Sequence, residues 1–290
     1  MSIPMNSICL ECVVKKHMTH AREIGTDEQA TELGKALARH YGNSAPDIDS
    51  AYFAMLLETD LRRIYGLEPN RLKEEKDISN RFVMERLEDI RQRIAKTEDP
   101  VYAALQFAVL GNYLDFSALA GQVSFEKLDE MLDGATKIDL DRETYRQFAE
   151  DLRNGKRLLY ITDNAGEICF DRVAAEVIKE TFPQLEITFL VRGEPVFNDA
   201  TREDAEFAGI PFPVIDNGTR IGGTTLSEIS KEALDAVKQA DVILAKGMGN
   251  TESMFGCGYN VYYAFLVKCP RFEQFFNAPK LKPMFVKDHK

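Results

Sequence analysis

The sequence predicts an α/β protein made of an all-helical N-terminal domain and a three-layer α/β/α domain with a largely parallel sheet. Glycine is unevenly distributed, since only seven of the 18 glycines precede residue 151. Before that point apolar residues recur at helical spacing, and after it short apolar strands alternate with helical segments. Such alternation is typical of a parallel sheet covered on both faces. We therefore predict a helical domain over 1–150 and a Rossmann-like catalytic domain over 151–290.

Composition excludes several classes of protein. The 290 residues carry 36 basic and 47 acidic side chains, a net charge of -11. An acidic surface repels phosphate backbones and anionic lipid, so nucleic-acid and membrane-surface partners are disfavoured. The first residues lack the pattern of a signal peptide, and five cysteines fit free thiols in a reducing compartment. We therefore expect a cytoplasmic protein, and leave open whether it is a monomer or a homo-oligomer.

The first half contains helices after a short leader. The leader is 1–20 and carries the Cys9-Leu10-Glu11-Cys12 motif. A helix is expected to begin at Thr26-Asp27-Glu28, because acidic residues follow a capping side chain. The other expected helices are 50–65, 70–96, 101–120, 124–133 and 141–153. The stretch 101–121 is the most apolar of the chain, but it includes polar side chains and is therefore predicted as a buried helix rather than a membrane span.

The pattern changes at Asn154-Gly155. Apolar runs of strand length follow, separated by segments with helical spacing. The expected strands are 157–162, 186–191, 212–215, 241–245, 261–268 and 283–286. The expected helices are 168–181, 200–208, 225–239 and 270–277.

Polar residues follow successive strands where each strand ends. Ligands of an open parallel sheet bind beyond the carboxyl ends of its strands, so these residues are the candidates for a site. The polar residues at the four strand ends are Asp163 and Asn164, Asp199, Asp216 to Gly218, and Lys246 to Asn250.

The first candidate group is Asp163, Asn164 and Asp199. Carboxylate and amide oxygens without a nearby histidine or thiolate favour Mg²⁺ or Mn²⁺ over a tetrahedral zinc site. Each of these residues also has a structural interpretation, because Asp and Asn commonly form turns and cap helices. The residues alone leave both interpretations open.

The second candidate group is Lys246 with Gly247, Gly249 and Asn250. Glycines let backbone N–H groups approach an anion, and a lysine adds a point charge, so this loop is a candidate phosphate site. The alternative is a glycine-rich strand exit with a lysine facing solvent. The spacing differs from a Walker loop, and no GxGxxG follows the first strand, which argues against an ordinary dinucleotide fold.

Together the two groups predict phosphoryl chemistry. A divalent ion would polarise phosphoryl oxygens, while Lys246 would neutralise charge on the phosphate. Attack by a metal-activated water and attack by the Asp163 carboxylate both remain open. The histidines, which are His17, His20, His40 and His289, offer no base in this domain. Without a GxSxG motif or an Asp-x-Asp after the first strand, serine hydrolases and haloacid-dehalogenase-type phosphatases do not fit.

Two further features lie in the helical half. Asn112 and Asp115 share a face of the buried helix, and they are either satisfied structurally or close over the site. Cys9 and Cys12 form a CxxC. To hold zinc, this motif would need two more ligands, and His17 and His20 are near enough to be considered. The pattern favours a reduced pair of packed thiols.

Three strings of residues together resemble the signatures of one protein family. They are Thr162-Asp163-Asn164-Ala165-Gly166-Glu167-Ile168, Arg192-Gly193-Glu194-Pro195 with Asn198-Asp199-Ala200-Thr201, and Lys246-Gly247-Met248-Gly249-Asn250. These look like the metal-dependent damage-control phosphatases, or ARMT-like proteins. The CxxC and Gly111-Asn112-x-x-Asp115 are similar to the microbial branch.

This resemblance implies a helical part against a three-layer α/β domain. It implies one divalent ion (Mn, Co, Ni or Mg) at the positions of Asp163, Asn164 and Asp199. It also implies that Lys246 contacts substrate phosphate and that Arg192 lies beside the site. We further expect Arg192 and Asn112 to help orient the substrate. The implied activity is hydrolysis of small phosphate monoesters, such as sugar phosphates or damaged phosphometabolites. The stretch 216–227 departs from the commonest family pattern, which leaves the substrate open.

Two other functions are kept as alternatives. The first alternative is an S-adenosylmethionine-dependent methyltransferase, because some members of the family were proposed to be protein carboxyl methyltransferases. Gly166 alone after the first strand fits that cofactor poorly. The other is a protein that binds a phosphorylated metabolite without turning it over.

Overall fold

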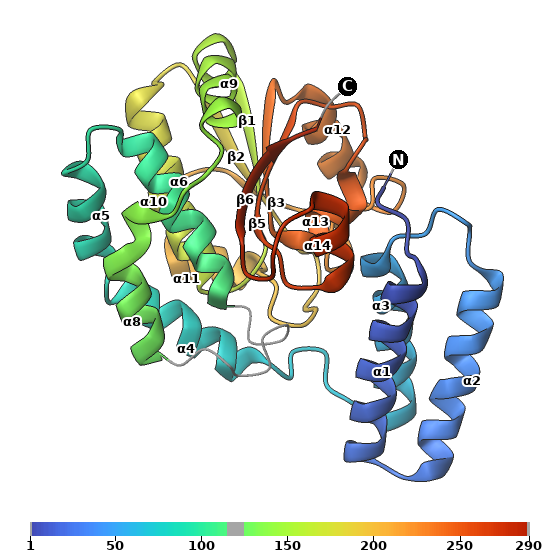
Figure 1. Ribbon diagram of the computed structural model, residues 1–290. Coiled ribbons are helices and arrows are strands. Elements are labelled where there is room, and N and C mark those ends of the chain that lie inside the picture. Colours follow the sequence, from blue (N-terminus) through green and yellow to red (C-terminus); the bar gives the residue numbers. More distant parts are fainter. Residues whose placement is uncertain (1, 115–124, 289–290) are drawn as a thin grey trace.

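The computed structural model describes residues 2–114 and 125–288. Three N-terminal helices form a bundle beside the rest of the molecule (Figure 1): α1 (Ser7–Ile24), α2 (Asp27–Asn43) and α3 (Ser50–Tyr65). The bundle has a small core of its own around Ala21, Leu33 and Leu61. The expected leader 1–20 is therefore wrong, because most of it is helix α1. The Asn6 side chain starts this helix by accepting hydrogen bonds from the N–H groups of residues 8 and 9.

The next helices run across one face of the sheet. They are α4 (Lys73–Met84), α5 (Leu87–Ala95), α6 (Pro100–Gly111), η1 (Asn112–Leu114), α8 (Phe125–Gly134), η2 (Ala135–Lys137) and α9 (Arg142–Asn154). The prediction of a single helix over 70–96 is wrong, because the helix is interrupted between Met84 and Leu87 and forms two helices, α4 and α5. The helix expected over 101–120 ends at Gly111, and its remainder, with Asp115, lies outside the described residues. No helix within 2–114 and 125–288 is both long and apolar enough to cross a membrane.

The second half forms one six-stranded sheet. Its strands are β1 (Arg157–Ile161), β2 (Glu186–Val191), β3 (Val214–Asp216), β4 (Val242–Lys246), β5 (Val261–Leu266) and β6 (Pro283–Lys287). They lie in the order β3-β2-β1-β4-β5-β6, and every neighbouring pair is parallel except β5 and β6. The α/β class with a largely parallel sheet is therefore confirmed.

Helices connect the strands. They are α10 (Glu167–Thr181), α11 (Arg202–Ala208), α12 (Lys231–Gln239), α13 (Gly247–Met254) and α14 (Pro270–Phe276). The expected start of α12 at 225 is wrong, because the Ser230 side chain caps the helix at residue 231. Helix α13 does not appear among the expected helices, since its two glycines have low helix propensity and its sequence has no helical apolar period.

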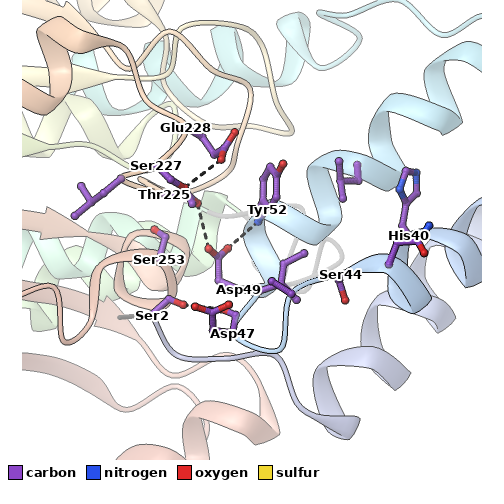
Figure 2. Close-up of a pocket in the computed structure, with 15 residues that line it drawn as sticks. Ser2, His40, Ser44, Asp47, Asp49, Tyr52, Thr225, Ser227, Glu228 and Ser253 are labelled. Atoms are coloured by element: carbon purple, nitrogen blue, oxygen red, sulfur yellow. Dashed lines mark hydrogen bonds between the residues drawn. The ribbon is translucent and has the colours of Figure 1, made fainter.

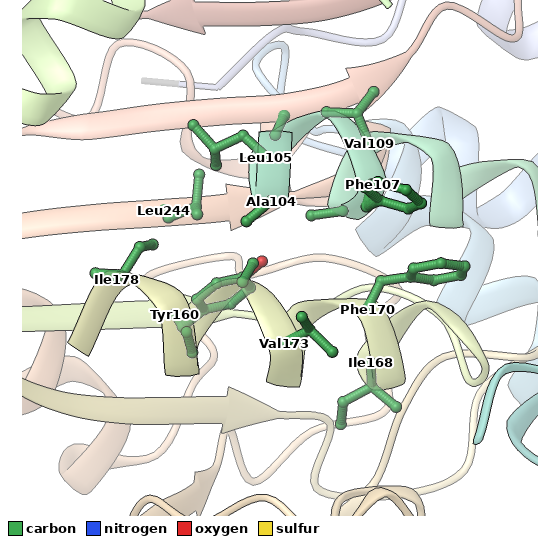
Figure 3. Packing of buried hydrophobic residues seen from close by; sticks show 14 of the residues in the cluster. Ala104, Leu105, Phe107, Val109, Tyr160, Ile168, Phe170, Val173, Ile178 and Leu244 are labelled. Atoms are coloured by element: carbon green, nitrogen blue, oxygen red, sulfur yellow. The ribbon is translucent and has the colours of Figure 1, made fainter. Parts of the chain in front are cut away.

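Side chains of each strand alternate between two apolar layers. Leu158 and Tyr160 of β1 belong to one buried cluster, whereas Leu159 and Ile161 belong to another. Figure 3 shows the first layer, where α6 packs against α10 and their phenylalanines stack with ring centroids 6.5 Å apart. Helices α12 and α14 cover the opposite face. The first cluster also includes apolar residues of 82–152, so these helices share a core with the sheet, and the division at residue 150 marks a change of secondary structure within that core.

Candidate active site

The strand order creates a crevice between β1 and β4. From β1 the chain continues to β2 on one side, while β5 follows β4 on the other side. The segments that leave the carboxyl ends of these two central strands therefore diverge, and an open α/β sheet binds ligands at such a switch point. Asp163 and Asn164 follow β1 after one intervening residue, and Gly247 directly follows β4.

Backbone hydrogen bonds bring Asp199 to this crevice. The Ala200 N–H donates to the Asp163 carbonyl at 2.7 Å, and the Ala165 N–H donates to the Asn198 carbonyl at 2.8 Å. Asn164 and Asp199 are paired as an isolated antiparallel bridge. The structure thus brings together the three predicted ligands. Asp163 is 8% exposed, Asn164 is 2% exposed and Asp199 is 6% exposed.

Two asparagine amides hold the Asp163 carboxylate. Nδ2 of Asn164 donates to Asp163 Oδ2 at 2.7 Å, and Nδ2 of Asn112 donates to the same oxygen at 2.9 Å. Both amides also donate to Glu167 Oε2 at 2.9 Å. The Leu266 N–H donates to Asn112 Oδ1, which fixes the orientation of that amide. Asn112 therefore reaches the site from the helical layer and acts by positioning Asp163.

Arg192 connects the loop after β2 to helix α13. It is 1% exposed, and its Nε donates to Asp199 Oδ2 at 2.7 Å, while Nη1 donates to Asn250 Oδ1 at 3.1 Å. Its Nη2 lies 3.9 Å from Asp163 Oδ1 and is buried without a hydrogen-bond partner in the described part of the chain. Nδ2 of Asn250 in turn donates to the carbonyls of Thr162 and Lys246. The Asn250 side chain thus connects the segment after β1 to the end of β4.

Lys246 lies beneath the crevice. Its ammonium is fully buried and donates to the Ala108 carbonyl, to Glu167 Oε1 and to Asp171 Oδ1 at 2.7–2.8 Å. Three donors are all that an ammonium has. The sequence predicts Lys246 as a ligand of phosphate, but in this structure it has no N–H left for one and does not line the cavity described below.

The buried cluster around Lys246 has shifted pKa values. Burial raises the pKa of Asp171 to about 7, and the charge of Lys246 opposes that rise. Burial would lower the pKa of Lys246, but the adjacent carboxylates of Asp171 and Glu167 raise it overall. The ammonium form therefore persists at neutral pH, and its charge is offset by the two carboxylates that it pairs with.

The glycines after β4 allow close packing. Gly247 has a φ of +79°, and a Cβ at this position would lie 2.0 Å from Asp163 Oδ2. A Cβ on Gly249 would lie 1.8 Å from the Gly222 carbonyl oxygen. Only glycine therefore lets the start of α13 approach the Asp163 carboxylate and the loop around residue 222.

A cavity of about 320 Å³ opens at this crevice. Its floor carries Asp163, Asn164 and Asp199, with the Asn198 side chain beside them. Both polar atoms of Asn198 are buried and have no hydrogen-bond partner among the described residues. The opposite wall belongs to α1 and α3 of the bundle and includes His17. Sequence reasoning missed His17, because nothing local signals that α1 folds back over the strand ends.

A larger cavity, of about 480 Å³, lies elsewhere between α2, α3 and the loop before α12. Figure 2 shows Asp49 in it, which accepts hydrogen bonds from the Tyr52 N–H and from the Thr225 hydroxyl. None of the predicted site residues lines this cavity. Its polar contacts join the bundle to the α/β layer, so the smaller cavity is the candidate active site.

The donor set of the smaller cavity fits a hard divalent ion. Two carboxylates and an amide line one cavity, and both polar atoms of Asn198, in the same lining, are buried without a partner among the described residues. Within the part of the chain that the structure describes, no three His, Cys, Asp or Glu side chains are grouped to hold a metal. Cys9 and Cys12 are free thiols, one buried and the other exposed, and they do not form a zinc site with histidines there.

The fold and site geometry agree with the comparison to known proteins. Residues 5–281 match the family described as the damage-control phosphatase ARMT1-like domain, and the chain belongs to this family. The resemblance that the strand-end motifs carry is thereby confirmed.

Individual relatives match over most of their length. The chain is 32% identical to an uncharacterized protein of Methanocaldococcus jannaschii, covering 92% of this chain and 90% of that protein. It is 32% identical to a damage-control phosphatase of Pyrococcus horikoshii, covering 85% and 83%, and 30% identical to one of Archaeoglobus fulgidus, covering 86% and 87%. A crystal structure of a DUF89 family protein from Pyrococcus horikoshii matches all of both chains with a TM-score of 0.84 and 27% identity.

Proposed function

We propose that this protein is a cytoplasmic phosphatase that hydrolyses small phosphate monoesters with one divalent metal ion, Mn²⁺, Co²⁺, Ni²⁺ or Mg²⁺. The observation that carries the proposal is the convergence of Asp163, Asn164 and Asp199 on one cavity at the switch point of the sheet. The names of the relatives from Pyrococcus horikoshii and Archaeoglobus fulgidus support phosphatase activity on damaged metabolites.

The chain's own residues supply binding and orientation. A divalent ion held by Asp163, Asn164 and Asp199 would polarise the phosphoryl oxygens. Arg192 is buried and does not line the cavity, so its role is to hold Asp199 and Asn250 in place rather than to contact phosphate. Met248 and Gly249, in the first turn of α13, line the same cavity. Because the first N–H groups of a helix have no partner within it, those of this turn are further candidates to bind phosphate.

The contacts of Asp163 favour water as the nucleophile. Its Oδ2 already accepts two amide hydrogen bonds and packs against Gly247. A carboxylate held so firmly is suited to orient an ion or a water molecule, and it has little room to move toward phosphorus. We therefore assign Asp163 to the ligand role, and Lys246 to holding Glu167 and Asp171 in place below it.

The test is turnover of p-nitrophenyl phosphate and a panel of sugar phosphates by metal-free protein supplied with each ion in turn. Asp163→Asn should lose more than about 100-fold in kcat/KM, because both charge and ion binding are lost. Asp216→Asn is the matched control, since Asp216 also ends a strand but pairs with Arg202 outside the cavity. Equal activity of Asp163→Asn and wild type would refute the proposal, and calorimetric titration with Mn²⁺ checks the ion independently.

A further inference from the structure

Asn198 differs from the other buried asparagines in the part of the chain that the structure describes. Its Nδ2 and Oδ1 atoms are both buried, in a residue that is 6% exposed, and neither has a hydrogen-bond partner among the described residues. The other buried asparagines each make at least two side-chain hydrogen bonds, and they are Asn80, Asn112, Asn164, Asn217 and Asn250. Buried polar groups are normally paired, so an amide with neither partner points to a ligand.

A tight turn fixes Asn198 beside a predicted metal ligand. The Asp199 N–H donates to the Val196 carbonyl at 3.0 Å and closes a turn whose central residues are Phe197 and Asn198. Phe197 has a φ of +44°, which few residue types other than glycine, asparagine and aspartate adopt in a turn. The Asn198 carbonyl also accepts from the Ala165 N–H at 2.8 Å. The backbone thus holds Asn198 in place from both sides, despite the strained conformation of Phe197.

This turn places Asn198 in the lining of the candidate active-site cavity. Asp163, Asn164 and Asp199 line the same cavity. Asn164 donates to Asp163, and Arg192 donates to Asp199, so these neighbours already have partners within the protein. The Asn198 amide has none among the described residues, and a molecule that enters the cavity is therefore the partner available to it.

An amide can bind two different partners at once. Its Nδ2 donates and its Oδ1 accepts, and both atoms are bonded to one carbon. Phosphoryl oxygens only accept hydrogen bonds, whereas a water molecule can donate one. In the hydrolysis of a phosphate ester these two partners must come together, because the water oxygen has to reach phosphorus. GTP-hydrolysing enzymes orient the attacking water with a glutamine amide, which is the same functional group.

We propose that Asn198 is a catalytic residue that donates from Nδ2 to a phosphoryl oxygen of the substrate and accepts at Oδ1 from the attacking water. This inference rests on the proposed function and adds a residue to its site. The water oxygen forms a bond to phosphorus while the bond from phosphorus to the alcohol oxygen breaks. The water releases one proton to solvent and the alcohol oxygen takes one from solvent, so the products are the alcohol and inorganic phosphate. Asn198 stays neutral throughout this step.

The first test removes both polar atoms with Asn198→Leu, which nearly keeps the size of the side chain. It should lower kcat for p-nitrophenyl phosphate at least about 100-fold, as the loss of a donor to the transition state does in other enzymes. It should not lower the urea midpoint of unfolding, because no side-chain hydrogen bond to the described residues is lost. Asn217→Leu is the matched control. Asn217 is also buried but is paired at both amide atoms, so its loss should lower that midpoint.

Two further measurements separate a contact to substrate from a contact to the ion. Asn198→Asp loses the donor and adds a negative charge beside phosphate, so inhibition by inorganic phosphate should weaken at least about 10-fold. Calorimetric titration of Asn198→Leu with Mn²⁺ should give the wild-type affinity, because Asp163, Asn164 and Asp199 remain. A loss of Mn²⁺ affinity as large as the loss of kcat would assign Asn198 to the ion and overturn the inference. An unchanged kcat in Asn198→Leu would overturn it as well.

A binding experiment on wild type separates this inference from the proposed function. In protein with ¹⁵N-labelled asparagine, the Nδ2 resonance of Asn198 should shift when inorganic phosphate is added to the Mg²⁺-loaded protein. A shift without turnover of any phosphate ester would refute the phosphatase and leave the contact of Asn198 to phosphate standing. Turnover of p-nitrophenyl phosphate without the shift would leave the phosphatase standing and refute the role of Asn198.

Discussion

The Lys246 ammonium lies 2.7 Å from the Asp171 carboxylate, and both side chains are fully buried beneath the candidate active site. Glu167 accepts from the same ammonium at 2.8 Å and also from the amides of Asn112 and Asn164. Lys246 thus fixes Glu167, and Glu167 in turn fixes two amides that hold Asp163. The sequence predicts that Lys246 contacts phosphate, but in this structure Lys246 acts by holding Glu167 in place.

Removing this ammonium should be costly to stability. Lys246→Met leaves two buried carboxylates without their cation, and we expect the free energy of unfolding to fall by about 3–5 kcal/mol. The double variant Lys246→Met with Asp171→Asn should recover part of that loss. Arg63→Met is the control, because Arg63 makes only exposed ion pairs and should cost less than about 1 kcal/mol. Urea denaturation followed by circular dichroism gives these values, and equal losses in the two single variants would contradict the prediction.

A methyl group at Gly247 should displace Asp163. Gly247→Ala forces an alanine into a backbone conformation with positive φ, which is destabilising, and it also places a Cβ against the Asp163 carboxylate. Gly258→Ala has a similar φ of +83° but open space around its Cβ, so it isolates the backbone cost of about 1 kcal/mol. We expect Gly247→Ala to lose Mn²⁺ affinity and phosphatase activity at least about 10-fold, while Gly258→Ala keeps both. Calorimetry and p-nitrophenyl phosphate turnover measure the two effects, and unchanged metal affinity in Gly247→Ala would argue against close contact with Asp163.

Arginine at position 192 should not be replaceable by lysine. Its guanidinium donates to Asp199 and to Asn250 at once, and one ammonium on a flexible stem cannot reproduce this fork. Arg192→Lys should lower kcat/KM by about 10–100-fold, as the loss of residues that orient metal ligands usually does.

Arg202→Lys provides a close comparison, since Arg202 Nε also donates to an aspartate at 2.7 Å, but at the exposed end of β3. It should leave kcat/KM within about twofold of wild type, because exposed ion pairs contribute little. A similar loss in both variants would show that the effect does not depend on the site.

Glu252 should make stability depend on pH. Burial raises its pKa from 4.5 to about 7, with the charge of Asp49 adding to the rise and the Ser50 hydrogen bond and Arg271 opposing it. The folded protein therefore keeps a proton that the unfolded chain has released. The stabilisation from this group is complete below pH 4.5 and is lost as the pH rises toward 7.

Glu252→Gln removes this titration. The free energy of unfolding of wild type, measured relative to Glu252→Gln, should therefore decrease between pH 5 and 7 and then level off. Urea titrations of both proteins at several pH values test this. Parallel curves for the two proteins would show that Glu252 ionises with the same pKa in the folded and unfolded states.

Local signals were sufficient for much of the fold. Helix α3 occupies the expected 50–65, because Asp49 caps its start and Gly66, with a φ of +67°, ends it. Strand β2 likewise occupies the expected 186–191, where five of the six residues are apolar or β-branched. The polar residues after β1 and β2 were recognisable for the same reason, because parallel strands end at one edge of the sheet.

The amino-acid sequence by itself determined the α/β class, the approximate positions of the strands and the placing of Asp163, Asn164 and Asp199 beyond strand ends. Periodicity and turn chemistry act over a few residues, and the chain carries them locally. Only the tertiary structure decided that Lys246 turns toward Glu167 and Asp171, and that α1 brings His17 over the strand ends. These contacts join segments far apart in the chain, and they depend on how whole layers pack, because a buried charge or acceptor takes its partner from whichever element folds against it.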